Sequence, residues 1–82
     1  MIIKHPLATE KAIRLIDREN KLVFVVEREA DKATIKSELE RIFKIKVIKV
    51  NTLIGPDGKK RAYVKLSPES PAIDLATKLG LM

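Results

Sequence analysis

The sequence predicts a single α+β domain with the order strand, helix, strand, helix, strand, strand, helix. Two observations predict it: the spacing of the apolar residues alternates between that of a strand and that of a helix, and capping residues stand where the helical stretches begin. The chain has 82 residues and no linker, repeat or low-complexity segment, so we expect one domain over residues 1–82. Such a small domain buries only about 60% of its unfolded surface, and its stability alone is expected to be modest.

The first strand and the first helix are predicted from the N-terminal quarter of the chain. Residues 1–4 are a short apolar start that suits an edge strand, which Pro6 closes. Thr9 fits the N-cap of the helix that follows, and Asn20 suits its C-terminal stop. The apolar face of this helix contains Ile13 and Ile16.

The central strand and the second helix have the clearest patterns. Residues 21–26 place apolar side chains on both faces, which is typical of a strand in the middle of a sheet. Asp31 fits the N-cap of the second helix, whose apolar residues follow the i, i+4, i+7, i+8 spacing of a buried stripe. The stripe consists of Ile35, Leu39, Ile42 and Phe43. Lys32 and Lys36 lie one turn apart on the opposite face.

A β-hairpin is predicted next, because residues 45–54 are rich in β-branched side chains, residues 55–58 have turn chemistry and residues 59–66 form a second strand. Its core face is expected to contain Ile48, Val50, Ala62 and Val64. Its other face is expected to contain Lys49, Asn51, Arg61, Tyr63 and Lys65. For the even-numbered core residues of one strand to lie opposite even-numbered residues of the other, the loop between the strands must contain about three or five residues. Gly58 is expected to form a bulge in this loop.

The last predicted element is a C-terminal helix. Ser70 suits its N-cap, Pro71 its first helical position and Gly80 its C-terminal stop. The face of this helix that packs on the domain is expected to contain Ile73, Ala76 and Leu79.

The net charge of +6 is concentrated in the middle of the chain. Residues 1–31 contain six basic and six acidic side chains, residues 32–65 contain ten basic and three acidic, and residues 66–82 contain one basic and two acidic. The middle block, with a net charge of +7, indicates a polyanionic partner. A solvated lysine-rich surface of the kind found in heat-adapted proteins is the alternative, and composition alone favours neither.

Catalysis and cofactor binding are not expected. The single histidine, His5, precedes a proline, and without any cysteine it has no partners for a metal cluster or a catalytic triad. Glu38 and Glu40 stand three and four residues before Arg41 and Lys44, which is typical of surface ion pairs. The turn of the hairpin lacks the spacing of a phosphate-binding loop. No apolar run is long enough for membrane insertion, and the absence of cysteine favours an intracellular location.

The hairpin is the best candidate for a binding site. The predicted hairpin brings the tip residues Lys59, Lys60 and Arg61 together with the polar-face residues Lys49, Asn51, Tyr63 and Lys65. Cations, an amide and an aromatic ring together suit phosphates and unpaired bases, although lysines on a hairpin also serve simply to prevent edge pairing. Residues 60–66 partly resemble the strand signature of the RNA recognition motif. They lack its glycine and two of its aromatic positions, and the order of elements differs.

Four motifs follow one another over nearly the whole chain. They are HPLATEKA at 5–12, KATIK at 32–36 with Leu39, Glu40 and Phe43, VNTL at 50–53, and KKRAYVKL at 59–66. With these motifs the chain resembles the family of large-subunit ribosomal protein L twenty-three, in its short archaeal form. The resemblance implies an antiparallel four-stranded sheet with helices packed on it, in the order β-α-β-α-β-β plus a C-terminal helix. Residues 2–4 would form the first strand.

The resemblance also implies a function. Members of this family are constituents of the large ribosomal subunit that bind the third domain of its rRNA near the polypeptide tunnel exit. The implied partners are large-subunit rRNA, neighbouring ribosomal proteins and the signal recognition particle, and the implied location is cytoplasmic, on the ribosome. Only residues 55–58 stand where bacterial members carry a long extension into the tunnel. This difference argues against a role inside the tunnel and favours the signal recognition particle over a bacterial-type chaperone.

The hairpin pattern and the resemblance together give a set of candidate site residues. Contacts with rRNA are assigned to Lys11, Lys32, Lys36, Lys49, Asn51, Thr52, Lys59, Lys60, Arg61 and Tyr63. The resemblance assigns factor docking to Glu10, although the helix dipole alone explains an acidic residue there. Two other functions stay open: a free-standing RNA-binding module of another ribonucleoprotein, and a small protein-interaction domain whose basic strip is only solvated.

Overall fold

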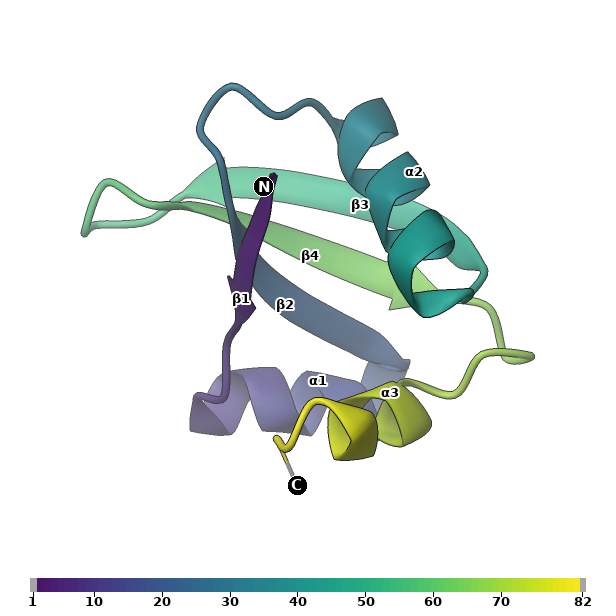
Figure 1. The fold of residues 1–82 in the computed structure, drawn as a ribbon. Helices are drawn as coiled ribbons and strands as arrows, with labels where there is room; N and C mark the ends of the chain where they lie inside the picture. Colours follow the sequence, from purple (N-terminus) through teal and green to yellow (C-terminus); the bar gives the residue numbers. More distant parts are fainter. Residues whose placement is uncertain (1, 82) are drawn as a thin grey trace.

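A computed structural model describes residues 2–81 and contains one antiparallel four-stranded sheet and three helices (Figure 1). The elements are β1 (Ile3–Pro6), α1 (Glu10–Glu19), β2 (Lys21–Val26), α2 (Lys32–Phe43), β3 (Val47–Ile54), β4 (Lys60–Leu66) and α3 (Ala72–Lys78). The strands lie side by side in the order β1-β2-β4-β3. The α+β class, the order of elements and the central position of residues 21–26 are therefore confirmed.

The hydrophobic core lies between one face of the sheet and the helices. Leu22, Phe24 and Val26 of β2 point into it, and α2 and α3 close it from the same side (Figure 1). The buried stripe of α2 is confirmed for three of its four residues: Ile35 and Leu39 are completely buried, and the ring of Phe43 stacks on that of Phe24 at a centroid distance of 6.2 Å. Ile42 is only half-buried and does not belong to the core cluster. Val23 and Val25 are also buried, on the other face, because α1 packs beside β2.

Local capping rules explain where α2 begins. The Asp31 carboxylate accepts a hydrogen bond of 2.7 Å from the backbone N–H of Thr34, as the N-cap prediction requires. Hydrogen bonds from the side chain and from the backbone N–H of Thr34 favour the charged carboxylate and lower the pKa of Asp31. The helix ends at Lys44, which adopts a left-handed backbone conformation with φ of 54°.

The hairpin has the predicted parity but not the predicted core face throughout. Val50 pairs with Val64 and Ile54 with Lys60, so residues 55–59 form a five-residue loop. The prediction for Ile48 is wrong, because the register shifts between Val47 and Lys49. The extra residue in β3 makes Val47 the buried side chain and leaves Ile48 exposed. Gly58 does adopt a left-handed conformation, but the register shift lies between Val47 and Lys49, at the end of the hairpin away from the loop.

The start of α3 also differs from the prediction. Ser70 is not its N-cap: the Ser70 hydroxyl accepts a hydrogen bond from the backbone N–H of Lys46, and Pro71 occupies the N-cap position. The N–H of Ala72 donates instead to the side chain of Asn20, at 2.6 Å. Ile73 is exposed, and the buried face consists of Ala72, Leu75 and Ala76. Gly80, with φ of 76°, ends the helix region as expected.

Candidate RNA-binding surface

The face of the sheet opposite the core is covered by a helix only beside β2, where α1 lies (Figure 1). Its outer part is solvent-accessible because α2 and α3 both pack on the core side. We call this surface the open face. Its polar and exposed side chains are Lys21, Lys49, Asn51, Leu53, Arg61, Tyr63 and Lys65.

Three lysines form a row across the open face. The strand register places Lys21 directly opposite Lys65, and Lys65 directly opposite Lys49. Neighbouring strands are about 4.8 Å apart, and like charges at such positions destabilise a sheet. The only carboxylate paired with this lysine row in the described part of the chain is that of Glu19, 3.2 Å from the Lys21 ammonium. A polyanion across the row would remove the repulsion.

The next two rows add an aromatic ring, an amide and a guanidinium. Tyr63 lies between Val23 and Asn51, and Arg61 lies between Val25 and Leu53. The Arg61 Nη2 atom is 3.8 Å from the Asp57 carboxylate, and its buried Nε has no hydrogen-bond partner among the described residues. The loose ion pair therefore leaves guanidinium donors available for a phosphate.

A shallow cavity of about 30 Å³ connects this surface to the first turn of α1. Its floor is apolar, and Lys11, Arg61 and Tyr63 are among the residues that line it. Lys11 comes from α1 and the other two from β4, so α1 joins β2, β3 and β4 as a fourth element of the candidate surface. Two cations beside an aromatic ring suit the phosphate and the base of an RNA strand that lies across this surface.

The structure brings together only part of the predicted site. Lys11, Lys49, Asn51, Arg61 and Tyr63 share the open face or its border, and Lys59 is exposed in the hairpin loop nearby. Lys32 and Lys36 are exposed on α2, which covers the opposite face. Thr52 is half-buried opposite Ala62, on the core side of β3.

The expectation that Lys60 is a free cation at the hairpin tip is wrong. Its ammonium donates hydrogen bonds to the backbone carbonyls of Ala30 at 2.7 Å and Arg28 at 3.2 Å. Alternate residues of a strand point to the same face, so Lys60 lies on the face of Ala62 and Val64. Its side chain therefore points to the core side, where the β2–α2 loop passes. Lys60 therefore holds this loop in place.

Lys21 of the row was absent from the predicted site, and Lys65 was placed on the candidate face of the hairpin but not among the assigned rRNA contacts. The hairpin pattern does place Lys65 on the polar face, but nothing in the local sequence shows that β2 pairs with β4. Without that pairing, Lys21 is an ordinary residue at the start of a strand. Glu40 also differs from its prediction as a surface ion pair, because its carboxylate accepts a hydrogen bond of 3.1 Å from the N–H of Val47.

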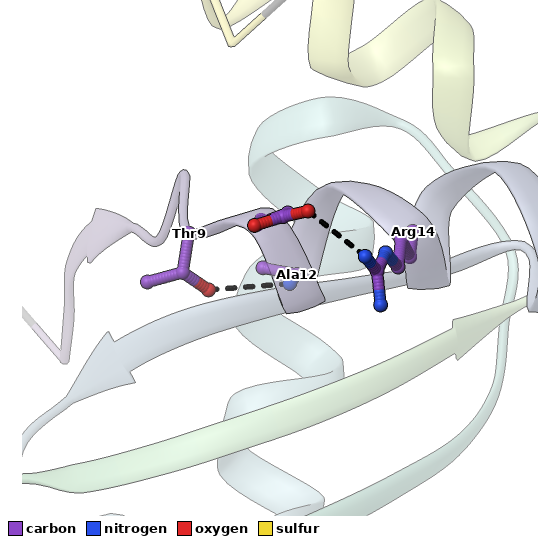
Figure 2. Close-up of polar contacts among 4 residues, drawn as sticks. Thr9, Ala12 and Arg14 are labelled. Atoms are coloured by element: carbon purple, nitrogen blue, oxygen red, sulfur yellow. Dashed lines mark hydrogen bonds and ion pairs between the residues drawn. The ribbon is translucent and has the colours of Figure 1, made fainter.

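The first turn of α1 presents a second polar surface. The Thr9 hydroxyl accepts a hydrogen bond of 3.2 Å from the N–H of Ala12, which confirms the predicted N-cap (Figure 2). The Glu10 carboxylate forms an ion pair of 2.8 Å with the guanidinium of Arg14, which lies one helical turn further along α1 (Figure 2). The Glu10 side chain is 83% exposed. Its carboxylate can therefore exchange Arg14 for a cation of another molecule.

Residues 2–81 contain no group of three or more histidine, cysteine, aspartate or glutamate side chains placed to hold a metal ion. Within the same range, no helix is both long and apolar enough to span a membrane.

Comparison with known proteins gives the family. The family model described as ribosomal protein L23 matches residues 1–74 of the chain. The large ribosomal subunit protein uL23 of Pyrobaculum aerophilum is 52% identical over 81 residues, which cover 99% of this chain and 100% of that protein. The match includes the strands and helices that build the open face. This chain therefore belongs to the ribosomal protein L23 family.

Proposed function

We propose that this protein is a structural constituent of the large ribosomal subunit and binds large-subunit rRNA through its open face, in the cytoplasm. The lysine row is the observation that supports this proposal most strongly, because it places three like charges at adjacent positions where a polyanion relieves their repulsion. Arg61, Lys11 and Lys59 extend the positive surface, and Tyr63 and Asn51 add groups that bind bases.

The same arrangement separates this function from the alternatives. A protein-interaction domain does not require three adjacent lysines, whereas each lysine that neutralises an RNA phosphate releases counterions and adds affinity. A free-standing RNA-binding module would have a similar surface. Co-sedimentation with purified large subunits in high salt distinguishes the two, because a constituent of the subunit stays bound and a free-standing module does not.

We expect the double variant Lys49→Ala/Lys65→Ala to bind a fragment of the third rRNA domain more weakly. Each lost phosphate contact should reduce the slope of log K against log salt concentration by roughly 0.7 to 0.9. Binding titrations at several potassium chloride concentrations measure both quantities. Lys78→Ala is the single-charge control, because it removes one exposed lysine from α3, on the other side of the molecule. A loss of log K in the double variant no greater than twice the loss in this control would show that only total charge matters.

We further propose that the outer side of α1 helps to dock the signal recognition particle near the tunnel exit. The family resemblance suggests the partner, and the exposed carboxylate of Glu10 beside Arg14 supplies a site at which ion pairs can exchange. This second surface is on α1, so that one molecule can bind rRNA with its sheet and a factor with its helix.

Large subunits that carry Glu10→Ala should bind the signal recognition particle several-fold more weakly, because a rim charge of this kind contributes about 1 kcal/mol. Asp17→Ala is the control, since it removes another exposed carboxylate from α1 without touching the first turn. Sedimentation of the particle with the variant subunits measures the effect. Equal binding by wild-type and Glu10→Ala subunits would exclude a docking role for this residue.

A further inference from the structure

Strand β3 is the long free edge of the sheet. In the order β1-β2-β4-β3 it has a neighbour on one side only, and it runs for eight residues, Val47–Ile54. The opposite edge is different, because β1 has four residues and α1 continues along β2 beyond it (Figure 1). The unpaired backbone of the sheet is therefore concentrated on β3.

The backbone groups of this edge are not used within the molecule. The N–H of Gly55 donates to the carbonyl of Lys59 at 2.9 Å, which sets the alternation of the hairpin ladder. By this alternation, the N–H and C=O groups of Val50, Thr52 and Ile54 point away from β4. Among the described residues, no hydrogen bond outside the sheet ladder involves the backbone of residues 48–54.

Apolar side chains accompany these backbone groups. Four large hydrophobic residues of the described chain are exposed, and three of them belong to β3: Ile48 at 54%, Leu53 at 48% and Ile54 at 55%. Proteins normally protect such an edge with proline, several lysines or a covering segment. Here β3 contains no proline and one lysine, so the edge is suited to pair with another strand.

We propose that the β3 edge binds an extended, acidic segment of another protein, which adds to the sheet as a fifth strand. A strand satisfies both the outward N–H donors and the outward carbonyl acceptors, and it covers the apolar side chains. A phosphate backbone has no donor for the carbonyls, so RNA fits this edge poorly. The proposal concerns the backbone edge of β3 and not the open face, although Leu53 belongs to both, and it does not depend on rRNA binding.

Charge determines the acidic character of the partner. β3 contains no acidic residue; the exposed side chain of Lys46 immediately precedes the strand, and that of Lys59 lies in the hairpin loop beyond its other end. A second copy of this chain would bring a net charge of +6 against another +6, which opposes self-pairing. An acidic segment reverses the sign of this interaction.

The first test uses a blocked ten-residue peptide of alternating valine and glutamate as the probe. Titration of the isotope-labelled protein should shift the amide resonances of Thr52 and Ile54 and leave those of β1 unchanged. Thr52→Pro removes one outward N–H and should weaken binding at least tenfold, whereas Thr52→Ala should bind like the parent. If Thr52→Pro does not fold, Ile54→Glu serves instead, because it places a negative charge on the same edge and should repel the acidic peptide.

Several results would overturn the proposal. One is that the amide resonances do not shift at millimolar peptide, and another is that a peptide of alternating valine and lysine binds as tightly as the acidic one. A third is that a ten-nucleotide RNA, or a raised protein concentration alone, shifts the same amide resonances. Lys65→Ala should leave peptide binding unchanged even though it weakens rRNA binding, so failure of one proposal is distinguishable from failure of the other.

The second test identifies the partner on the ribosome. A photoreactive p-benzoylphenylalanine in place of Ile54, in purified large subunits, should crosslink to one protein segment with a negative local charge. A crosslink to rRNA, a crosslink to a second copy of this chain, or the absence of any crosslink would contradict the inference.

Discussion

Leu39→Ala is expected to destabilise the isolated domain by about 2 to 5 kcal/mol. Leu39 is completely buried on α2, between Ile35 and Phe43 along the apolar stripe. The substitution removes its transfer free energy and leaves a cavity that the sheet below cannot fill. Since small domains have a total stability of only about 5 to 15 kcal/mol, the loss is a large share. Urea and thermal unfolding measure it.

Leu53→Ala is the matched control for this prediction, because the same atoms are removed from a leucine that is 48% exposed. It should cost much less, within about 1 kcal/mol. A bound rRNA fragment should restore part of the stability of Leu39→Ala by mass action, provided that rRNA binds the folded form only. Equal unfolding of Leu39→Ala and the parent would contradict the helix packing described above.

Asn20→Gly is expected to destabilise the domain by about 2 to 4 kcal/mol. The Asn20 amide donates hydrogen bonds to the carbonyls of Leu66 at 3.0 Å and Ser67 at 3.1 Å, and its oxygen accepts from the N–H of Ala72. One side chain thus connects the end of α1, the end of β4 and the start of α3. Glycine keeps the positive φ of 54° at this position, so the variant isolates the loss of these bonds.

Two further measurements make this prediction specific. Asn20→Ala should lose about 1 kcal/mol more than Asn20→Gly, because alanine is strained at positive φ. Hydrogen exchange of the Ala72 amide should accelerate in both variants, since that N–H loses its acceptor. Unfolding of Asn20→Gly at the same urea concentration as the parent would show that solvent replaces the amide.

The parts of the fold that sequence predicts correctly depend on local rules. Thr9 and Asp31 cap their helices because a side chain reaches an N–H three residues away, and the stripe of α2 follows from helical spacing alone. Ser70 fails because the true acceptor for α3, Asn20, is 52 residues away in the chain. Ile48 fails because one inserted residue at a bulge changes which side chain is buried.

The candidate site was predicted less completely than the fold. The alternation of side chains along the two strands of the hairpin is enough to place Lys49, Asn51, Arg61 and Tyr63 on one face. The position of Lys21 beside Lys65 requires the pairing of β2 with β4, which joins residues about 40 positions apart and leaves no periodic signal in the sequence. Local patterns therefore predict the residues of one hairpin, whereas the full lysine row depends on tertiary structure.

The lysine row makes the protein respond to its ionic surroundings in two opposite ways. In the free protein, dissolved salt screens the repulsion between Lys21, Lys65 and Lys49 and so favours the folded sheet. In the proposed complex with rRNA, the same salt competes with the protein for the RNA and favours release. The proposed binding is thus expected to be strongest at an intermediate ionic strength, where the free domain is already folded and the RNA still attracts it.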